Sequence, residues 1–226
     1  MDGLLRLKKW MTLTAVCFVM NIAVLGTSNA TPLSNTPVSW TDFASTWAPT
    51  NVQVRESPFV FSDGASGKIV SIAYLSSGGA ANGKWVYAYQ VIFESGQGSI
   101  TAMALGPSPA PVSVGASNSF QTSKPSGDTH FSEFKQNGVS TLTGIYEPTT
   151  KTYTWFFTTG IGVGGNSVVF GYFSDKTPTL ARANLFNGLT GLKSQPAVLV
   201  ASPEPAVLSL LTIGLLGIAG FRKRRK

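Results

Sequence analysis

The sequence predicts an all-β fold for the central part of the chain: an antiparallel, jelly-roll-like β-sandwich of about eight to ten strands. Only 12% of the 226 residues are charged, while 24 are glycine and 13 are proline, a composition typical of short strands joined by turns. Residues 31–201 show alternating apolar and polar side chains rather than helical periodicity. A signal peptide is expected before this body, and a transmembrane helix after it.

Two neighbouring strands are expected at 69–75 and 84–94, because glycine and asparagine residues interrupt the chain between them. The second strand reads KWVYAYQVIFE, and its odd-numbered positions carry large apolar side chains. Its even-numbered positions are mixed. One face of this strand is therefore expected to meet the core, and the other to be partly wet.

The remaining strands are expected in the second half of the body, separated by turns. Their predicted ranges are 100–105, 139–146, 152–159 and 167–173. The segment 106–127 is rich in proline, serine and glycine, so a long loop or an irregular edge is expected there. Two alternatives stay open near the end: 178–191 holds a short strand or one helical turn, and 198–200 is a closing strand or part of a linker.

The charge distribution argues against a nucleic-acid partner. Of the formal net charge of +7, residues 1–30 contribute +2 and residues 202–226 contribute +4, which leaves about +1 for the body. The body has no cluster of basic and aromatic residues, so DNA and RNA are excluded as partners. The single cysteine, Cys17, lies before the body, so the body has no disulfide, thiol nucleophile or cysteine metal site.

The first thirty residues have the pattern of a secretory signal peptide. Their basic start is formed by Arg6, Lys8 and Lys9. An apolar stretch follows at 11–25, and Ser28-Asn29-Ala30 offers the small residues that signal peptidase accepts. We expect transport by the secretion translocon and cleavage after Ala30, against the alternative of a retained membrane anchor.

The C-terminal part of the chain has the features of a short membrane span. Residues 206–221 carry no charge, and as a helix they would extend about 24 Å, close to the hydrocarbon thickness. Five consecutive basic residues follow, namely Arg222, Lys223, Arg224, Arg225 and Lys226. Because basic clusters beside a span stay in the cytoplasm, the body is expected outside the inner membrane.

The triplet Pro203-Glu204-Pro205 stands directly before this span, and Ser202 precedes it. Triplet, span and basic cluster together resemble the PEP-CTERM sorting signal of Gram-negative bacteria. The resemblance covers residues 202–226 only, and Ser202 stands where valine is commoner. It implies recognition and processing by exosortase, a membrane enzyme found in organisms that make exopolysaccharide.

The chemistry of the triplet suits such a role. Two prolines hold the backbone extended and remove amide donors that a helix could use, so the segment stays open to a protease. Glu204 is unfavourable in lipid and marks the outer boundary of the span. The hydrophobic tail is then expected to be removed, so the membrane association is transient.

The body offers little that predicts catalysis. The only histidine, His130, is expected in a solvated loop, and no metal site or cofactor is expected. The carboxylates of Glu94, Glu133 and Glu147 could supply a glycosidase pair, but Glu94 and Glu147 each begin a turn, where exposed acids are common. We also interpret the aspartates Asp63 and Asp128 as turn residues rather than calcium ligands.

Aromatic residues of two strands have two possible roles. The set is Trp85, Tyr87, Tyr89, Tyr153 and Trp155. It could form a platform on which sugar rings stack, although burial in the core is the favoured interpretation. Tyr89 and Trp155 are the candidate sugar-stacking residues.

These features predict an exported, non-enzymatic protein of the cell surface or extracellular matrix. Its expected partners are signal peptidase, the translocon, exosortase and exopolysaccharide, as in a biofilm matrix. One alternative is an exported carbohydrate-active hydrolase that carries the same tail. Another is an inner-membrane protein that keeps its tail and faces the periplasm.

Overall fold

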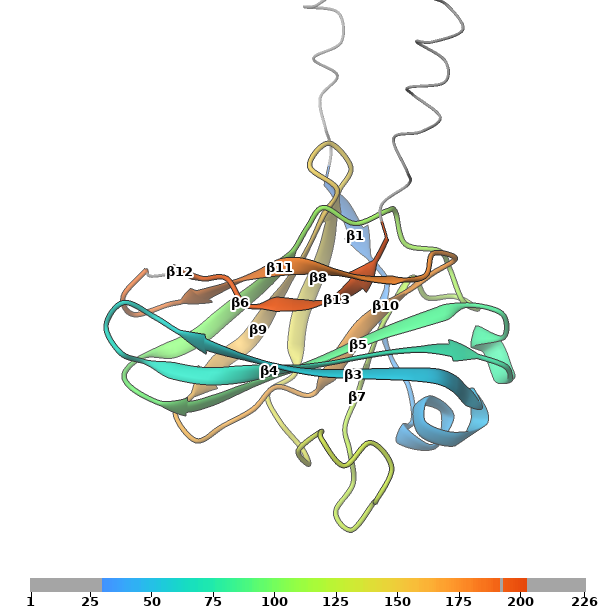
Figure 1. The fold of residues 1–226 in the computed structure, drawn as a ribbon, viewed down its shortest axis with the longest axis horizontal. Helices are drawn as coiled ribbons and strands as arrows, with labels where there is room; N and C mark the ends of the chain where they lie inside the picture. The colour runs from blue at the N-terminus through green and yellow to red at the C-terminus, as the bar shows by residue number, and fades with distance from the viewer. Residues whose placement is uncertain (1–29, 192, 203–226) are drawn as a thin grey trace, which may run out of the picture.

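The computed structural model describes residues 30–191 and 193–202, and within them the chain is all-β. Thirteen strands form two sheets that lie face to face in a β-sandwich-like arrangement (Figure 1). Among these residues, no helix is both long and apolar enough to cross a membrane. The predicted span at 206–221 and, apart from Ala30, the predicted signal peptide fall on residues outside this description.

Sheet A contains seven strands, of which six follow one another in space. Their order is β1 (Thr31–Leu33), β8 (Thr141–Glu147), β9 (Thr152–Gly162), β6 (Ser99–Leu105), β11 (Pro178–Asn187) and β12 (Lys193–Ser194). The seventh, β13 (Ala197–Ala201), pairs with β11 as well. Every pair in this sheet is antiparallel.

Sheet B contains six strands in one row. Their order is β2 (Asn35–Pro37), β7 (Ser119–Thr122), β10 (Val169–Ser174), β5 (Trp85–Ser95), β4 (Ser66–Ser76) and β3 (Pro49–Val60). Two helical turns, η1 (Asp42–Thr46) and η2 (Gly79–Ala81), lie in the connections β2–β3 and β4–β5.

The six strands predicted between 69 and 173 are confirmed as β4, β5, β6, β8, β9 and β10. The predicted count of about eight to ten is too low for the described residues, because β1, β2, β7 and β12 have only two to four residues each. The wholly antiparallel prediction is also wrong at one place, since β2 and β7 pair in parallel. The jelly-roll-like connectivity stays a prediction.

The two open alternatives resolve as strands. Residues 178–187 form β11 and residues 197–201 form β13, so neither a helical turn nor a linker occupies these positions. The segment 106–127 is not wholly a loop, because it contains β7, which pairs with β10.

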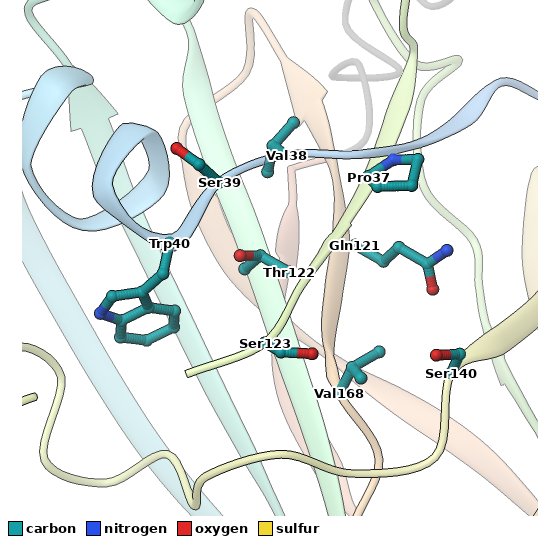
Figure 2. A pocket seen from close by; sticks show the side chains of 9 residues that line it. All are labelled: Pro37, Val38, Ser39, Trp40, Gln121, Thr122, Ser123, Ser140 and Val168. Carbon is teal, nitrogen blue, oxygen red and sulfur yellow. The ribbon is translucent and has the colours of Figure 1, made fainter. Parts of the chain in front are cut away.

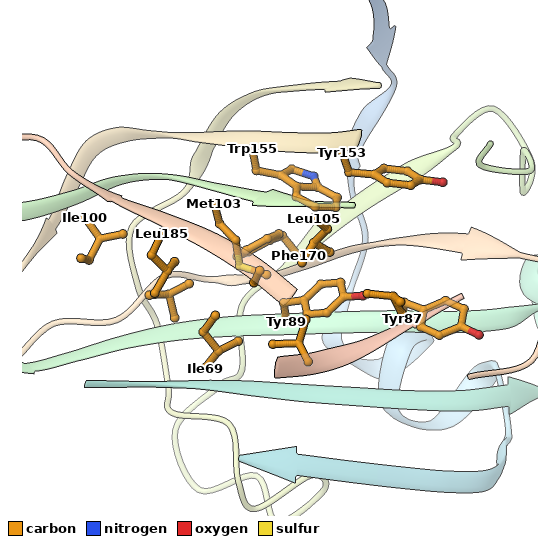
Figure 3. Close-up of a cluster of buried hydrophobic side chains, with 14 of the residues drawn as sticks. Ile69, Tyr87, Tyr89, Ile100, Met103, Leu105, Tyr153, Trp155, Phe170 and Leu185 are labelled. Carbon is orange, nitrogen blue, oxygen red and sulfur yellow. The ribbon is translucent and has the colours of Figure 1, made fainter. Parts of the chain in front are cut away.

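The main core lies between the sheets and is rich in tyrosine. Tyr87 and Tyr89 of β5 face Tyr153 and Trp155 of β9 across the gap between the sheets (Figure 3). Tyr172 of β10 joins them, with its ring centroid 4.2 Å from that of Tyr153 and 5.1 Å from that of Tyr87. We call these five residues the tyrosine layer, and all of them except Trp155 bring a hydroxyl into the core.

Each hydroxyl of the tyrosine layer has a partner, as a buried polar group requires. The Tyr89 hydroxyl donates to the Leu199 carbonyl at 2.7 Å, and the Tyr172 hydroxyl accepts from the Ala201 amide at 2.9 Å. Both of these partners belong to β13. Elsewhere in the layer, the Tyr87 hydroxyl donates to the Lys176 carbonyl and that of Tyr153 to the Pro109 carbonyl. The last described strand is therefore held by the centre of the core.

A second hydrophobic cluster covers the outer face of sheet B. Trp40, Phe43 and Trp47, in and around η1, pack there with Phe134 of a later loop. Of the even-numbered side chains that we expected to be partly wet, Val86, Ala88, Gln90 and Ile92 are buried beneath this cover, whereas Glu94 is exposed and Lys84 is partly exposed. The expectation was wrong for the middle of the strand, because segments far away in the sequence cover a face that the local pattern leaves mixed.

The tyrosine layer predicts a loss of stability in alkali. Burial raises the pKa of Tyr172 to about 12, and burial together with the neighbouring Tyr172 raises the pKa of Tyr89 well above 10. In the unfolded chain tyrosines ionise near pH 10, so the contribution of these tyrosines to the free energy of unfolding should be constant below pH 10 and fall above it. Each tyrosine that is ionised in the unfolded chain but still protonated in the folded state lowers the free energy of unfolding by about 1.4 kcal/mol per pH unit.

Urea unfolding followed by circular dichroism, from about pH 8 to pH 12, measures this effect. An unfolding free energy that stays constant across that window would contradict the burial of the layer.

Candidate functional site

The parallel pairing of β2 with β7 builds one side of the candidate site. Pro37 lies beside Gln121 in this register, and the Val38 amide donates to the Gln121 carbonyl at 2.9 Å. The chain then turns into η1 and places Trp40 over the outer face of sheet B. Residues from two distant parts of the sequence thus come together at this edge.

A cavity of about 390 Å³ lies at this junction, within the range of small-ligand pockets (Figure 2). Its lining residues are Pro37, Val38, Ser39, Trp40, Gln121, Thr122, Ser123, Ser140 and Val168. None of them carries a charge. The lining therefore combines hydroxyl and amide groups with apolar side chains. We call this space the Trp40 cavity.

Two buried polar atoms at the Trp40 cavity have no partner. Of the buried side-chain nitrogen and oxygen atoms in residues 30–191 and 193–202, Trp40 Nε1 and Thr122 Oγ1 lack a hydrogen bond. Trp40 is 7% exposed and Thr122 is 4% exposed. Neither atom is open to solvent, and the indole nitrogen of Trp40 points away from the other lining residues (Figure 2), so each costs the folded protein about 1–3 kcal/mol.

A second cavity, of about 670 Å³, adjoins the loop that follows β7. Its lining residues are Lys124, Asp128, Thr129, Ser132, Phe134, Lys135, Gln136, Asn137 and Asn166. The Lys124 side chain links the two cavities: its Nζ lies 5.8 Å from the Trp40 ring centroid and donates to the Phe131 carbonyl at 2.9 Å. Lys124 is 4% exposed, so this cation is held against the indole ring.

Asp128 lies in the loop that follows Lys124 and contacts His130 there. Its Oδ1 accepts from the His130 amide at 2.8 Å and lies 3.2 Å from the His130 ring Nδ1. The nearby indole N–H of Trp40, and then His130, lower the pKa of the Asp128 carboxyl, although that N–H does not reach hydrogen-bond geometry. Asp128 is therefore ionised at neutral pH and acts as a turn residue, as predicted.

The prediction that Tyr89 and Trp155 stack on sugar rings is wrong. Tyr89 and Trp155 are both completely buried, in the main core between the sheets. Their rings lie 6.1 Å apart and pack on other aromatic side chains, so neither has a face open to a sugar. The core interpretation of these aromatics is the one that the structure supports.

The acidic candidates for catalysis lie in three separate parts of the described chain. Glu94 is the last but one residue of β5, Glu133 is in the loop after β7, and Glu147 is the last residue of β8. His130 is exposed in the same loop as Glu133, as we expected for a solvated histidine. Among the described residues, no three His, Cys, Asp or Glu side chains gather where they could hold a metal ion.

The residues of the predicted sorting signal are not placed. Pro203, Glu204 and Pro205, and the basic cluster at 222–226, lie outside the described residues. Ala30, the predicted cleavage position, is exposed and directly precedes β1. Their roles therefore stay predictions from the sequence.

Sequence reasoning missed Trp40, Thr122 and Lys124. Thr122 and Lys124 lie in the part of the chain predicted as a loop, and Trp40 precedes a single helical turn, so no periodicity marks them. The signal that identifies Trp40 and Thr122 is burial of a polar atom without a partner, and that of Lys124 is a buried cation; both depend on the folded structure. Comparison with known proteins adds no assignment, because no family model, curated protein or solved structure matches this chain.

The unpaired hydroxyl predicts an unusual stability effect. Thr122→Val keeps the shape and removes the hydroxyl, so the free energy of unfolding should be unchanged or raised. Thr141 is a matched control, because it is also 4% exposed but its hydroxyl donates to Gln121 Oε1 at 2.9 Å and accepts from Asn35 Nδ2.

Thr141→Val should lose about 1–3 kcal/mol, since it leaves buried polar groups without a partner. Chemical denaturation of both variants measures the difference. Equal destabilisation by the two substitutions would show that the Thr122 hydroxyl has a partner in the folded protein.

Proposed function

We propose that this chain is an exported, non-enzymatic protein of the cell surface or extracellular matrix, sorted by exosortase and associated with exopolysaccharide. The observation that carries the proposal is the order of three features at the C-terminus. Pro203-Glu204-Pro205 is followed by the uncharged stretch 206–221 and then by the basic cluster 222–226. This order fits export through the inner membrane followed by release of the tail.

The connection between the last strand of the folded body and the tail supports the proposal. Strand β13 ends at Ala201, and the Ser202 amide donates to the Thr177 carbonyl at 2.8 Å. The triplet begins at the next residue, Pro203. Cleavage at the triplet would therefore leave all thirteen strands intact, including the residues of β13 that complete the core.

The positions of the two described chain ends also support it. The start of β1 and the end of β13 lie on the same side of the body, the upper side in Figure 1. The loop after β7, which borders the candidate site, lies on the opposite side. Before the tail is released, a body held at the membrane by its C-terminal end would thus present this loop to the outside.

Mass spectrometry of the mature C-terminus tests the proposal, in host strains with and without exosortase. The protein from the exosortase-positive strain should lack residues 206–226, and the protein from the other strain should retain them. Glu204→Ala should abolish processing, whereas Ser202→Ala, just outside the triplet, should be processed normally. An intact Lys226 in the exosortase-positive strain contradicts processing and favours the inner-membrane alternative.

A further inference from the structure

The folded body ends only a few residues before the predicted membrane span. Ser202 is still held to the body, because its amide donates to the Thr177 carbonyl at 2.8 Å. The Ala201 amide, one residue earlier, donates to a hydroxyl of the tyrosine layer at 2.9 Å. Only residues 203–205 then separate the body from the uncharged stretch 206–221. Covalent geometry therefore limits how far the body can lie from the membrane.

The connecting residues give a short reach. An extended chain covers at most about 3.6 Å per residue, so the path from Ser202 to Ala206 spans at most about 14 Å. The headgroup layer of one leaflet takes up about 5–8 Å of this distance. Ser202 thus lies within about 9 Å of the headgroup surface, close to the Debye length of about 8 Å at physiological ionic strength. Charged groups beside Ser202 therefore interact with charged lipids while the tail is in place.

The turn between β8 and β9, residues 148–151, lies beside this C-terminal end. The Ser108 amide donates to the Lys151 carbonyl at 2.8 Å, and the Ser108 hydroxyl lies 3.0 Å from the Tyr172 hydroxyl. The same Tyr172 hydroxyl accepts from the last residue of β13. The turn stands at the top of the body in Figure 1, next to the start of β1. Hydrogen bonds thus connect it to the strand that leads to the tail.

The turn between β10 and β11, residues 175–177, adjoins the same end directly, because it contains Thr177, the partner of Ser202. The Lys176 carbonyl in this turn accepts from the Tyr87 hydroxyl of the tyrosine layer at 2.7 Å. We call residues 148–151 and 175–177 the tail-side turns. The core of the body therefore fixes the backbone of both turns close to the point where the tail begins.

The tail-side turns and their surroundings carry a positive balance of charge. Lys151 is exposed in the first turn, and Lys176 lies in the second. The acid of the second turn, Asp175, is paired with Lys84 at 2.6 Å. Glu147, directly before the first turn, is the other acid. Three lysines against two acids leave +1, and the predicted cleavage before β1 would add a free amino group next to β8.

We propose that the tail-side turns rest on anionic phospholipid headgroups until the tail is cleaved. The proposal rests on the proposed function in one respect, because it needs residues 206–221 to span the membrane. The ammonium groups of Lys151 and Lys176 bind the phosphates, and the hydroxyls of the exposed residues Thr149 and Thr150 donate to phosphate oxygens. Two lysines alone bind a membrane weakly, so cleavage of the tail releases the body.

Fluorescence quenching in lipid vesicles tests this contact. The chain is purified with its tail intact from a host without exosortase. It carries Cys17→Ser and one dye, at Thr149→Cys in the first tail-side turn or at Ser126→Cys in the loop after β7, and both of these positions are exposed. The vesicles contain phosphatidylcholine, phosphatidylglycerol and a lipid with a nitroxide on its headgroup. The dye at position 149 should lose its emission, and the dye at position 126 should keep it.

A change of charge should alter the contact in proportion. Lys151→Asn should lower the ratio of docked to free body about fivefold, the effect of one lysine near an anionic surface. Asparagine is chosen because it tolerates the left-handed backbone of this residue, whose φ is 53°. Lys135→Asn, which alters an exposed lysine of the loop after β7, is the matched control and should dock as the unaltered chain does.

Three outcomes overturn the proposal. The first is equal quenching of the two dyes. The second is the same quenching at position 149 in vesicles of phosphatidylcholine without phosphatidylglycerol, which would show that the lipid charge is not recognised. The third is quenching that appears only after exosortase is added to the vesicles, which would identify a protein as the partner of the tail-side turns.

Failure of this contact and failure of the proposed function are distinguishable. Flotation of the same vesicles on a density gradient shows whether the chain is anchored in the membrane. A chain that floats with the vesicles but is not quenched at position 149 keeps the sorting tail and loses the headgroup contact. A chain that does not float lacks the span, and both proposals then fail.

Discussion

The tyrosine layer is the interaction on which the rest of the structure depends. It brings together side chains of β5 and β10 in sheet B and of β9 in sheet A, and it stacks their rings at centroid distances down to 4.2 Å. Aromatic side chains supply large buried areas, but buried hydroxyls are tolerated only with partners. Two of those partners lie in β13, so the layer joins the two sheets and fixes the end of the folded body in one arrangement.

The tyrosine layer packs on the inner face of sheet B only, so other residues cover its outer face. The candidate site lies among these covering residues. Residues around η1 and the loop after β7 close over apolar side chains of β4, β5 and β10. Where the two covering segments meet β7, the packing is incomplete, and the Trp40 cavity remains. The start of β1 and the end of β13 lie on the side of the body opposite the loop after β7 (Figure 1).

The sequence predicted the all-β class and six long strands, because strands such as β5 alternate clearly between large and small side chains. It did not predict β3, whose first half is largely exposed and mixes polar with apolar residues, or β7, which is four residues long. The sequence allowed Tyr89 and Trp155 to lie either in the core or on a sugar-binding platform. Only the position of the opposing sheet shows that they lie in the core. Thr122 and Trp40 could not be found at all, since a missing hydrogen-bond partner is a property of the assembled fold.

Amide hydrogen exchange at β13 tests most directly whether the tyrosine layer holds the strand that leads to the tail. The Ala201 amide, bonded to the Tyr172 hydroxyl, should exchange as slowly as amides of the central strand β5. In Tyr172→Phe the Ala201 amide should exchange faster, while β5 keeps its protection. Rapid exchange of Ala201 in the unaltered chain, at the rate of an unstructured segment, would contradict the account.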